Sequence, residues 1–310
     1  MNKYIILKLS SVFWLIPLFL WAQMPPQKTT LTYIQQQDVE LKLDIYQIPE
    51  IAEEARPCII FVFGGGFKEG TRDAETYKKF FDYFSRKGYI TVAIDYRLGL
   101  KNIDKAPSAF NQEPLDNAIH LAVEDLYWAT SYLLKNAEKY NIDPSKIIIC
   151  GSSAGAIIVL QADYEKCNTA ALSKILPETF RYAGVISFAG AIYSTEGTPK
   201  YAVEPAPTLF FHGSGDRLVP YHRIRLFNKG MFGSKSLAAK FKKSNYPYCF
   251  FSMEGIGHEV AEYPMTDYLP EIERFIQTFI INGKRLYIDV NVEDEARKPT
   301  ITVSPKDYYK

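Results

Sequence analysis

The chain has 310 residues, enough for one large domain with a sizeable core or for two small domains. Its 36 Lys and Arg residues balance its 35 Asp and Glu residues, and the two signs are mixed along the sequence. This composition argues against a nucleic-acid-binding protein and against a protein that binds an anionic membrane through its charge.

The first 22 residues have the pattern of a signal peptide. Lys3 and Lys8 give this segment a positive start, and a short apolar run, Ser10–Ala22, follows. The run is shorter than the roughly 20 apolar residues that span a bilayer, so a cleaved leader is favoured over a membrane anchor. We expect cleavage after Ala22 and an exported protein, periplasmic or extracellular, with no stable membrane anchor.

The four cysteines do not form the pattern of a disulfide framework, although export permits disulfides. Cys58 begins one apolar strand and Cys150 ends another, which would place them at opposite ends of two neighbouring parallel strands. Cys167 follows a predicted helix, and Cys249 lies in an apolar run. We therefore expect buried free thiols, because cysteine packs well as a small apolar side chain.

Strands alternate with helices along the mature chain. An alternating pattern over residues 29–47 predicts an antiparallel hairpin at a sheet edge. Further strands are predicted at 58–63, 89–96, 147–150, 183–189, 208–212 and 248–253, and helices at 77–88, 115–140, 155 onward, 221–232 and 265–281. This order predicts an α/β fold with a mostly parallel central sheet and helices on both faces, in one catalytic domain over residues 23–282. The tail, residues 283–310, has one alternating stretch and no predicted role.

One stretch, Lys146–Gly155, organises the rest of the chain. The apolar residues Ile147–Cys150 predict a buried strand, and Gly151-Ser152-Ser153-Ala154-Gly155 leads from it into a helix. A sharp strand-to-helix turn over G-x-S-x-G exposes the central serine hydroxyl, and glycines flank it because a Cβ there would meet nearby backbone. Ser153 is therefore the predicted nucleophile. A plain glycine-serine turn is the alternative interpretation of this motif.

A serine nucleophile needs a base and a group that orients the base. His258 follows the strand predicted at 248–253 and is the predicted base, whereas His120, His212 and His222 are less well placed in the chain order. Asp216, in the glycine-rich turn after the strand predicted at 208–212, is the predicted acid. Glu254 and Glu259 are the alternatives for the acid.

Backbone N–H groups that bind the developing oxyanion are also expected. Ala154, the residue after the nucleophile, gives one donor. The loop after the strand predicted at 58–63 reads Gly64-Gly65-Gly66, and we assign the second donor to Gly65 and Gly66, where the backbone can approach a substrate. All these features fall at carboxyl ends of strands, where parallel sheets carry their sites.

Together these residues resemble the serine carboxylesterases of the α/β-hydrolase superfamily, in particular the branch with an HGGG-type oxyanion loop. The motifs are FGGGF at 63–67, DYR at 95–97, GSSAG at 151–155, HGSGD at 212–216 and GIGH at 255–258. Phe63 stands where that branch usually has histidine. The resemblance implies the α/β-hydrolase fold, and the short connection over residues 190–206 implies a small or absent lid and an open site.

We therefore expect an exported serine esterase that works through an acyl-enzyme on small-molecule or polymer-borne esters, such as acetyl or feruloyl esters of polysaccharides. No metal or organic cofactor is expected, because no metal-ligand motif is visible. A serine peptidase of the same fold and a non-catalytic binding protein of the same fold are the alternatives. The acyl and alcohol specificity and the oligomeric state are left open.

Overall fold

The computed structural model describes residues 25–36, 39–48, 54–103, 107 and 111–309. The predicted signal peptide, residues 1–22, lies outside the described residues. Within the described part, no helix is both long enough and apolar enough to cross a membrane. Likewise, no group of three His, Cys, Asp or Glu residues in that part is arranged to hold a metal ion.

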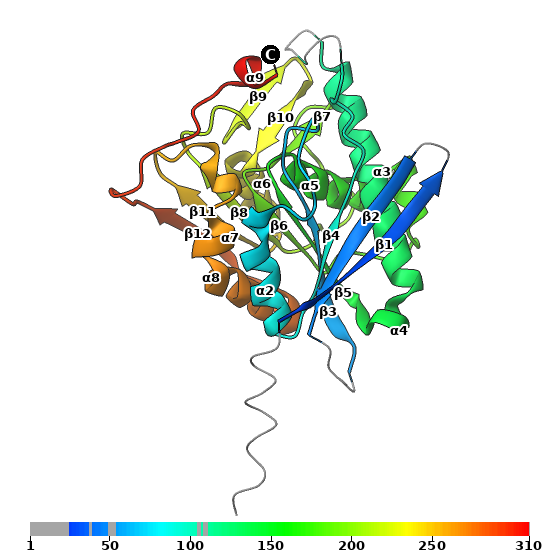
Figure 1. Cartoon of the computed structure of the whole chain (residues 1–310). Helices are drawn as coiled ribbons and strands as arrows, with labels where there is room; N and C mark the ends of the chain where they lie inside the picture. The colour runs from blue at the N-terminus through cyan, green and yellow to red at the C-terminus, as the bar shows by residue number, and fades with distance from the viewer. Residues whose placement is uncertain (1–24, 37–38, 49–53, 104–106, 108–110, 310) are drawn as a thin grey trace, which may run out of the picture.

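Nine strands of the described chain form one central sheet (Figure 1). In spatial order they are β1 (Gln27–Gln36), β2 (Val39–Gln47), β4 (Ile90–Ile94), β3 (Arg56–Val62), β5 (Ile142–Ser152), β6 (Gly184–Phe188), β8 (Thr208–Gly213), β11 (Tyr248–Met253) and β12 (Tyr287–Val292). The β1–β2 and β2–β4 pairs are antiparallel, and every pair from β4 to β12 is parallel. The mostly parallel sheet and the edge hairpin are both confirmed.

Helices cover the sheet. They are α2 (Lys78–Arg86), α3 (Glu113–Lys135), α4 (Ala137–Tyr140), α5 (Ala154–Cys167), α6 (Ser234–Ser244), α7 (Pro264–Asp267), α8 (Leu269–Phe275) and α9 (Pro305–Tyr308). Helix α3 packs on α5, whereas α2 packs on α7 and α8. The helix predicted at 265–281 is broken between α7 and α8, where Pro270 lacks the N–H that a continuous helix needs.

The core consists of the apolar strands and the aromatic face of α2. Ile147–Cys150 in β5 are fully buried, as are Ile59–Val62 in β3 and Phe80 and Phe84 in α2. All four cysteines are buried and free, as expected. Cys58 pairs with Ile147, whereas Cys150 pairs with Phe61 three residues further along. Their thiols therefore lie too far along the sheet from each other to form a disulfide.

The helix predicted at 221–232 is wrong. The structure has two short strands there, β9 (Arg223–Leu226) and β10 (Lys229–Gly233), and β10 also pairs with β7 (Ala191–Ser194). All four residues of β9 are exposed, so its apolar side chains do not mark a buried helix face. Arg223, Ile224, Arg225 and Leu226 alternate between polar and apolar with the period of a strand. Phe227 and Asn228 form the turn, with Phe227 at a φ of 53°.

The sheet continues beyond residue 282, where the sequence analysis ended the catalytic domain. Strand β12 runs parallel to β11, with Tyr248 opposite Tyr287 and Met253 opposite Val292. The alternating apolar residues that the sequence could not assign are the residues of this edge strand. After β12 the chain continues past the carboxyl ends of the strands and finishes in α9, beside the β9–β10 hairpin (Figure 1).

Candidate active site

Ser153 lies at the tight turn between β5 and α5. Its backbone is held at a φ of 51° and a ψ of −114°, a strained conformation for a residue with a side chain. Its N–H donates to the Phe188 carbonyl at 2.9 Å, which fixes the turn against β6. A Cβ at Gly151 would overlap the backbone of Gly155, and a Cβ at Gly155 would overlap the backbone of Val62. These glycines are therefore required by the turn itself.

Ser153, His258 and Asp216 form one chain of hydrogen bonds. Ser153 Oγ lies 2.7 Å from His258 Nε2, and His258 Nδ1 lies 2.7 Å from Asp216 Oδ2. His258 and Asp216 are buried, and Ser153 is half-buried. With the Nδ1–H of His258 donating to the carboxylate, its Nε2 is free to accept the Ser153 proton. The structure thus brings together the three residues that the sequence nominated.

The Asp216 carboxylate is held ionised. Burial alone would raise its pKa, but the hydrogen bonds from His212 and His258 outweigh burial, and the pKa lies below its ordinary value. The other oxygen, Oδ1, accepts the N–H groups of Leu218 at 2.8 Å and Val219 at 3.0 Å. Both carboxylate oxygens are therefore occupied, which fixes the direction in which Asp216 presents Oδ2 to His258.

His212 is the site residue that the sequence analysis missed. It is fully buried at the end of β8, and its Nε2 lies 3.3 Å from Asp216 Oδ2, the same oxygen that His258 contacts. Its Nδ1 lies 2.8 Å from Ser234 Oγ. The signal was present in the spacing HGSGD, because a turn residue four positions after a strand-end histidine can fold back onto it. His212 is correctly excluded as the base, but it supports the acid.

The other candidate residues lie outside the triad. The carboxylate of Glu259 accepts backbone N–H groups of its own loop and of the C-terminal segment, and Glu254 accepts the hydroxyl of Ser252. His120 is bound to Asp116 on the outer part of α3. The carboxylates of Glu254 and Glu259 are engaged by these other partners, whereas Asp216 Oδ2 lies 2.7 Å from His258 Nδ1, so Asp216 is the residue that fills this position.

The glycine loop lies beside the serine. Gly66 and Ala154 line the same cavity as Ser153, with Gly66 at a φ of 61°. Gly65, at a φ of 113°, forms the turn, and its carbonyl accepts the N–H groups of Lys68 and Glu69 at 3.0 Å. Gly66 and Ala154 therefore line the cavity at the serine, and Gly65 forms the turn beside Gly66; the roles of these three residues as oxyanion donors stay predictions.

Phe63 fills the position where related oxyanion loops have histidine. Its ring is buried and stacks near the ring of Tyr96, with centroids 4.5 Å apart. The Tyr96 hydroxyl donates to the Phe63 carbonyl at 3.2 Å, and the Gly64 N–H donates to the Tyr77 hydroxyl at 3.3 Å. The conformation of the glycine loop is thus held by the packing of Phe63 on Tyr96 and by the hydroxyls of Tyr77 and Tyr96.

A cavity of about 430 Å³ opens at Ser153. Its lining is mainly apolar and comes from α5 and the oxyanion loop, the start of α3, Tyr193 of β7, the loop after Asp216, the β9–β10 hairpin and the C-terminal segment. The hairpin contributes Ile224, Leu226 and Met231, and the C-terminal segment contributes Pro305, Tyr308 and Tyr309. Two segments that the sequence did not assign to the site therefore form walls of this cavity, while the expectation of an open site stays a prediction.

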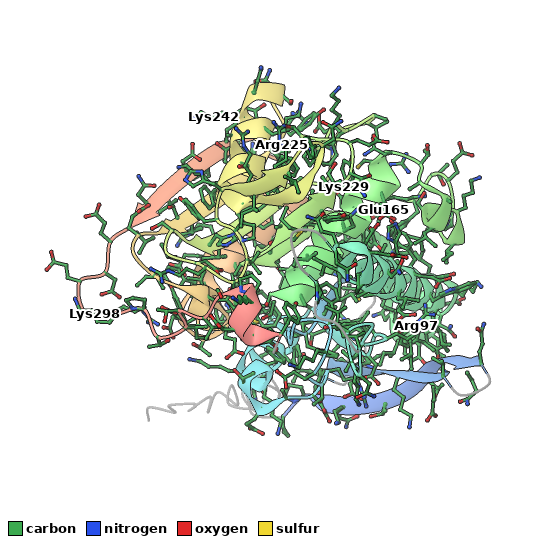
Figure 2. The ribbon with its side chains drawn as sticks, turned by 90° about the horizontal axis from the view of Figure 1, so that it is seen from above. Arg97, Glu165, Arg225, Lys229, Lys242 and Lys298 are labelled. Carbon is green, nitrogen blue, oxygen red and sulfur yellow. The ribbon has the colours of Figure 1, made fainter. Side chains whose placement is uncertain are left out.

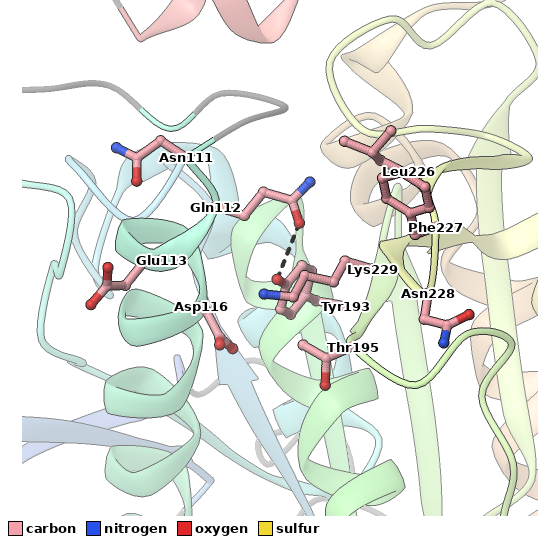
Figure 3. A pocket seen from close by; sticks show the side chains of 10 residues that line it. All are labelled: Asn111, Gln112, Glu113, Asp116, Tyr193, Thr195, Leu226, Phe227, Asn228 and Lys229. Atoms are coloured by element: carbon pink, nitrogen blue, oxygen red, sulfur yellow. Dashed lines mark hydrogen bonds between the residues drawn. The ribbon is translucent and has the colours of Figure 1, made fainter.

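A second cavity of about 640 Å³ adjoins the first and shares Gln112, Tyr193 and Leu226 with it (Figure 3). Its lining is more polar and includes Asp116, Asn228 and Lys229, with Phe227 at the hairpin tip. Tyr193 donates its hydroxyl hydrogen to Gln112 Oε1 at 3.2 Å across the junction of the two cavities. The reacting serine thus faces an apolar cavity that continues into a polar one.

Comparisons with known proteins show that the chain is similar to proteins named as esterases. A family model described as BD-FAE matches residues 43–196. Fumonisin B1 esterase of Sphingopyxis macrogoltabida is 26% identical over 116 residues, which are 37% of this chain and 21% of that protein. Gut esterase 1 of Caenorhabditis briggsae is 31% identical over 113 residues, which are 36% of this chain and 19% of that protein. The chain thus spans about a fifth of the length of these relatives.

Solved structures share the fold over most of the chain. The butyrate-bound thermophilic esterase Est2 of Thermogutta terrifontis aligns with a TM-score of 0.60 at 22% identity, covering 80% of this chain and 93% of that one. Thermogutta terrifontis esterase 2 phosphonylated by cyclosarin aligns with a TM-score of 0.61 at 21% identity, covering 86% and 98%. The predicted fold class, a mostly parallel sheet with helices on both faces, is confirmed.

Proposed function

We propose that this chain, whose residues 43–196 match the BD-FAE family model, is an exported serine esterase of the α/β-hydrolase fold that hydrolyses carboxylic esters through an acyl-enzyme. The observation that carries the proposal is the hydrogen-bonded chain from Ser153 through His258 to Asp216 at the mouth of an apolar cavity. Export rests on the leader pattern of residues 1–22 alone.

In the proposed reaction, Ser153 Oγ attacks the ester carbonyl carbon while His258 Nε2 takes the hydroxyl proton. The carbonyl oxygen becomes negative, and backbone N–H groups of the oxyanion loop and of Ala154 stabilise it. The C–O bond to the alcohol then breaks, with His258 returning the proton to the leaving oxygen. Water, deprotonated by His258, attacks the acyl-enzyme, and the acid leaves as Ser153 recovers its proton.

The proposed substrates are esters of short acyl groups, or acetyl and feruloyl esters carried on polysaccharides. An apolar cavity beside Ser153 suits an acyl group, and the adjoining polar cavity suits a hydroxyl-rich alcohol. A peptidase of the same fold is the less favoured candidate, because no additional domain or large cap occurs in the described residues. A non-catalytic binding protein is also less favoured, since the nucleophile, base and acid are all retained.

The test is hydrolysis of p-nitrophenyl acetate, butyrate and octanoate by the mature protein. We expect turnover that Ser153→Ala lowers by about 10³-fold or more, and labelling of Ser153 by an organophosphate. Ser152→Ala is the matched control, because Ser152 is the buried neighbouring serine of the same turn. This variant should keep the wild-type activity within a few fold. Absence of turnover and of labelling in a folded protein would favour the binding-protein interpretation.

A further inference from the structure

We call the C-terminal segment after β12, residues 293–309, the strap. It passes over the carboxyl ends of the strands, where the triad lies. It leaves the sheet, reaches an outer bend near Lys298, and returns to the middle of the molecule, where α9 lies (Figure 2). At the bend, the guanidinium of Arg297 lies 3.9 Å from the centroid of the Tyr263 ring, and its Nη2 lies 2.7 Å from Asp267 Oδ2.

The strap is attached to the loop of the catalytic histidine. The N–H of His258 donates to the Ile301 carbonyl at 3.2 Å, and the Glu259 carboxylate accepts the N–H groups of Thr300 and Ile301 at 3.2 and 3.0 Å. A Cβ at Gly257 would overlap the Ile301 carbonyl, so the two backbones are in close contact. The strap therefore has a fixed position directly beside the base.

The strap is attached to the oxyanion loop as well. The Tyr309 hydroxyl donates to the Gly66 carbonyl at 3.1 Å, and the Tyr308 hydroxyl donates to Glu69 Oε1 at 3.1 Å. Lys68 Nζ lies 3.3 Å from the Tyr308 carbonyl. A Cβ at Gly66 would overlap the Tyr308 ring, so this ring lies against the backbone of the predicted oxyanion donor.

The two tyrosines have different surroundings. Tyr309 packs against the hydrophobic core, and its burial raises the pKa of its hydroxyl to about 12. Tyr308 lies on α9 and lines the cavity that contains Ser153, with the apolar hairpin residues Ile224 and Leu226 also lining it. Tyr309 also lines this cavity but is held between the core and the Gly66 carbonyl, whereas the Tyr308 ring forms the wall of the cavity beside Gly66.

We propose that Tyr308 determines acyl specificity by packing its ring against the acyl chain of the substrate, in the cavity shared by the strap and the β9–β10 hairpin. This inference rests on the proposed esterase function. An acyl chain of two carbons ends near Ser153, whereas one of eight carbons extends along the cavity and gains apolar contact with the wall. Tyr308 should therefore contribute to the binding of long chains and little to the turnover of acetate.

The experiment compares kcat and KM for p-nitrophenyl acetate and octanoate in the wild type and in three variants. Tyr308→Ala should raise KM for octanoate about tenfold and leave acetate within twofold. Tyr308→Phe keeps the ring and loses only the hydrogen bond to Glu69, so its chain-length preference should match the wild type. Lys306→Ala changes an exposed side chain of the same short helix and is the matched control.

A second measurement does not depend on turnover. Calorimetric titration with octanoate should show about tenfold weaker binding to Tyr308→Ala than to the wild type, with equal melting temperatures as evidence of folding. Equal octanoate binding by the two proteins, or an equal change in KM for both esters, would overturn the inference. A wild type that binds octanoate but hydrolyses neither ester would instead contradict the proposed function while leaving the role of Tyr308 supported.

Discussion

The catalytic edge and the walls of the cavity are built in different ways. Ser153, Asp216 and His258 each follow a parallel strand of the central sheet, and the registers of β5, β8 and β11 bring their side chains together. The β9–β10 hairpin and the strap lie outside that sheet: the hairpin is held by the pairing of β10 with β7, and the strap by individual side-chain and backbone contacts. The reacting groups therefore depend on the sheet core, whereas the shape of the cavity also depends on peripheral segments, of which the strap contacts the loops of His258 and Gly66.

Gly66→Ala changes the contact between the oxyanion loop and the strap, and after Ser153→Ala it has the largest expected effect on activity. The new Cβ would overlap the Tyr308 ring and displace the oxyanion loop, so we expect kcat to fall about 10²-fold. Gly66→Ala combined with Tyr308→Ala should recover part of that loss, because the overlapping ring is gone. Gly283→Ala is the matched control: Gly283 has the same φ of 61° but open space around it. If the double variant is no more active than Gly66→Ala, the walls and the catalytic edge are not coupled here.

His212→Asn tests whether the catalytic edge extends beyond the three residues of the triad. Loss of the second histidine contact to Asp216 Oδ2 should loosen the orientation of the acid, with about tenfold lower kcat and little change in KM. The exposed His222, ten residues later, offers the control His222→Asn. Because Asp216 would lose a partner that lowers its pKa, the variant should also be less stable than the wild type toward acid. Unchanged kcat with intact folding would assign His212 to packing alone.

Asp163→Asn has the smallest expected effect on activity, because Asp163 is buried in α5 on the core side, away from the cavity. Burial raises the pKa of the Asp163 carboxyl to about 7, although the hydrogen bond that it accepts from the Ala206 N–H favours the ionised form and lowers the pKa. In the unfolded chain an aspartate ionises near pH 4, so the folded protein binds the extra proton between about pH 4 and 7. The wild type should thus lose unfolding free energy as pH rises through that window, on the order of a few kcal/mol.

Denaturant unfolding of both proteins at pH 4.5 and pH 7.5 measures this difference, with p-nitrophenyl butyrate turnover as the activity control. The Asn variant should show a flatter dependence of stability on pH and unchanged turnover. A parallel pH dependence in the two proteins would mean that Asp163 is ionised in the fold.

The catalytic edge could be predicted from the sequence because its determinants are local. Apolar runs mark β5, β8 and β11, and the reacting residues follow each run within a few positions. The glycines at 151 and 155 are required by the backbone at that turn, and this requirement is visible in the motif. Because the strands are parallel, the residues that follow them meet at one edge of the sheet. This holds even for Ser153 and His258, which are 105 positions apart in the sequence.

The walls could not be predicted in the same way. In β9 the apolar residues Ile224 and Leu226 are exposed to the cavity side, so they carry no signal of a buried face. Most of the strap is exposed and has no regular apolar period. Its path depends on individual long-range contacts, such as Glu259 with the Ile301 N–H and Tyr309 with the Gly66 carbonyl, and these partners are encoded nowhere near the strap in the sequence.

The four buried thiols offer a way to measure how fast individual strands and helices of the fold open. Burial raises the pKa of each, to about 12 for Cys249 and further for Cys58, Cys150 and Cys167, so thiolate is scarce in the native state. Reaction with a soluble thiol reagent must then proceed through conformations in which the strand or helix has opened. Because these cysteines lie in β11, β3, β5 and α5, their separate labelling rates report the opening of separate elements around the catalytic edge.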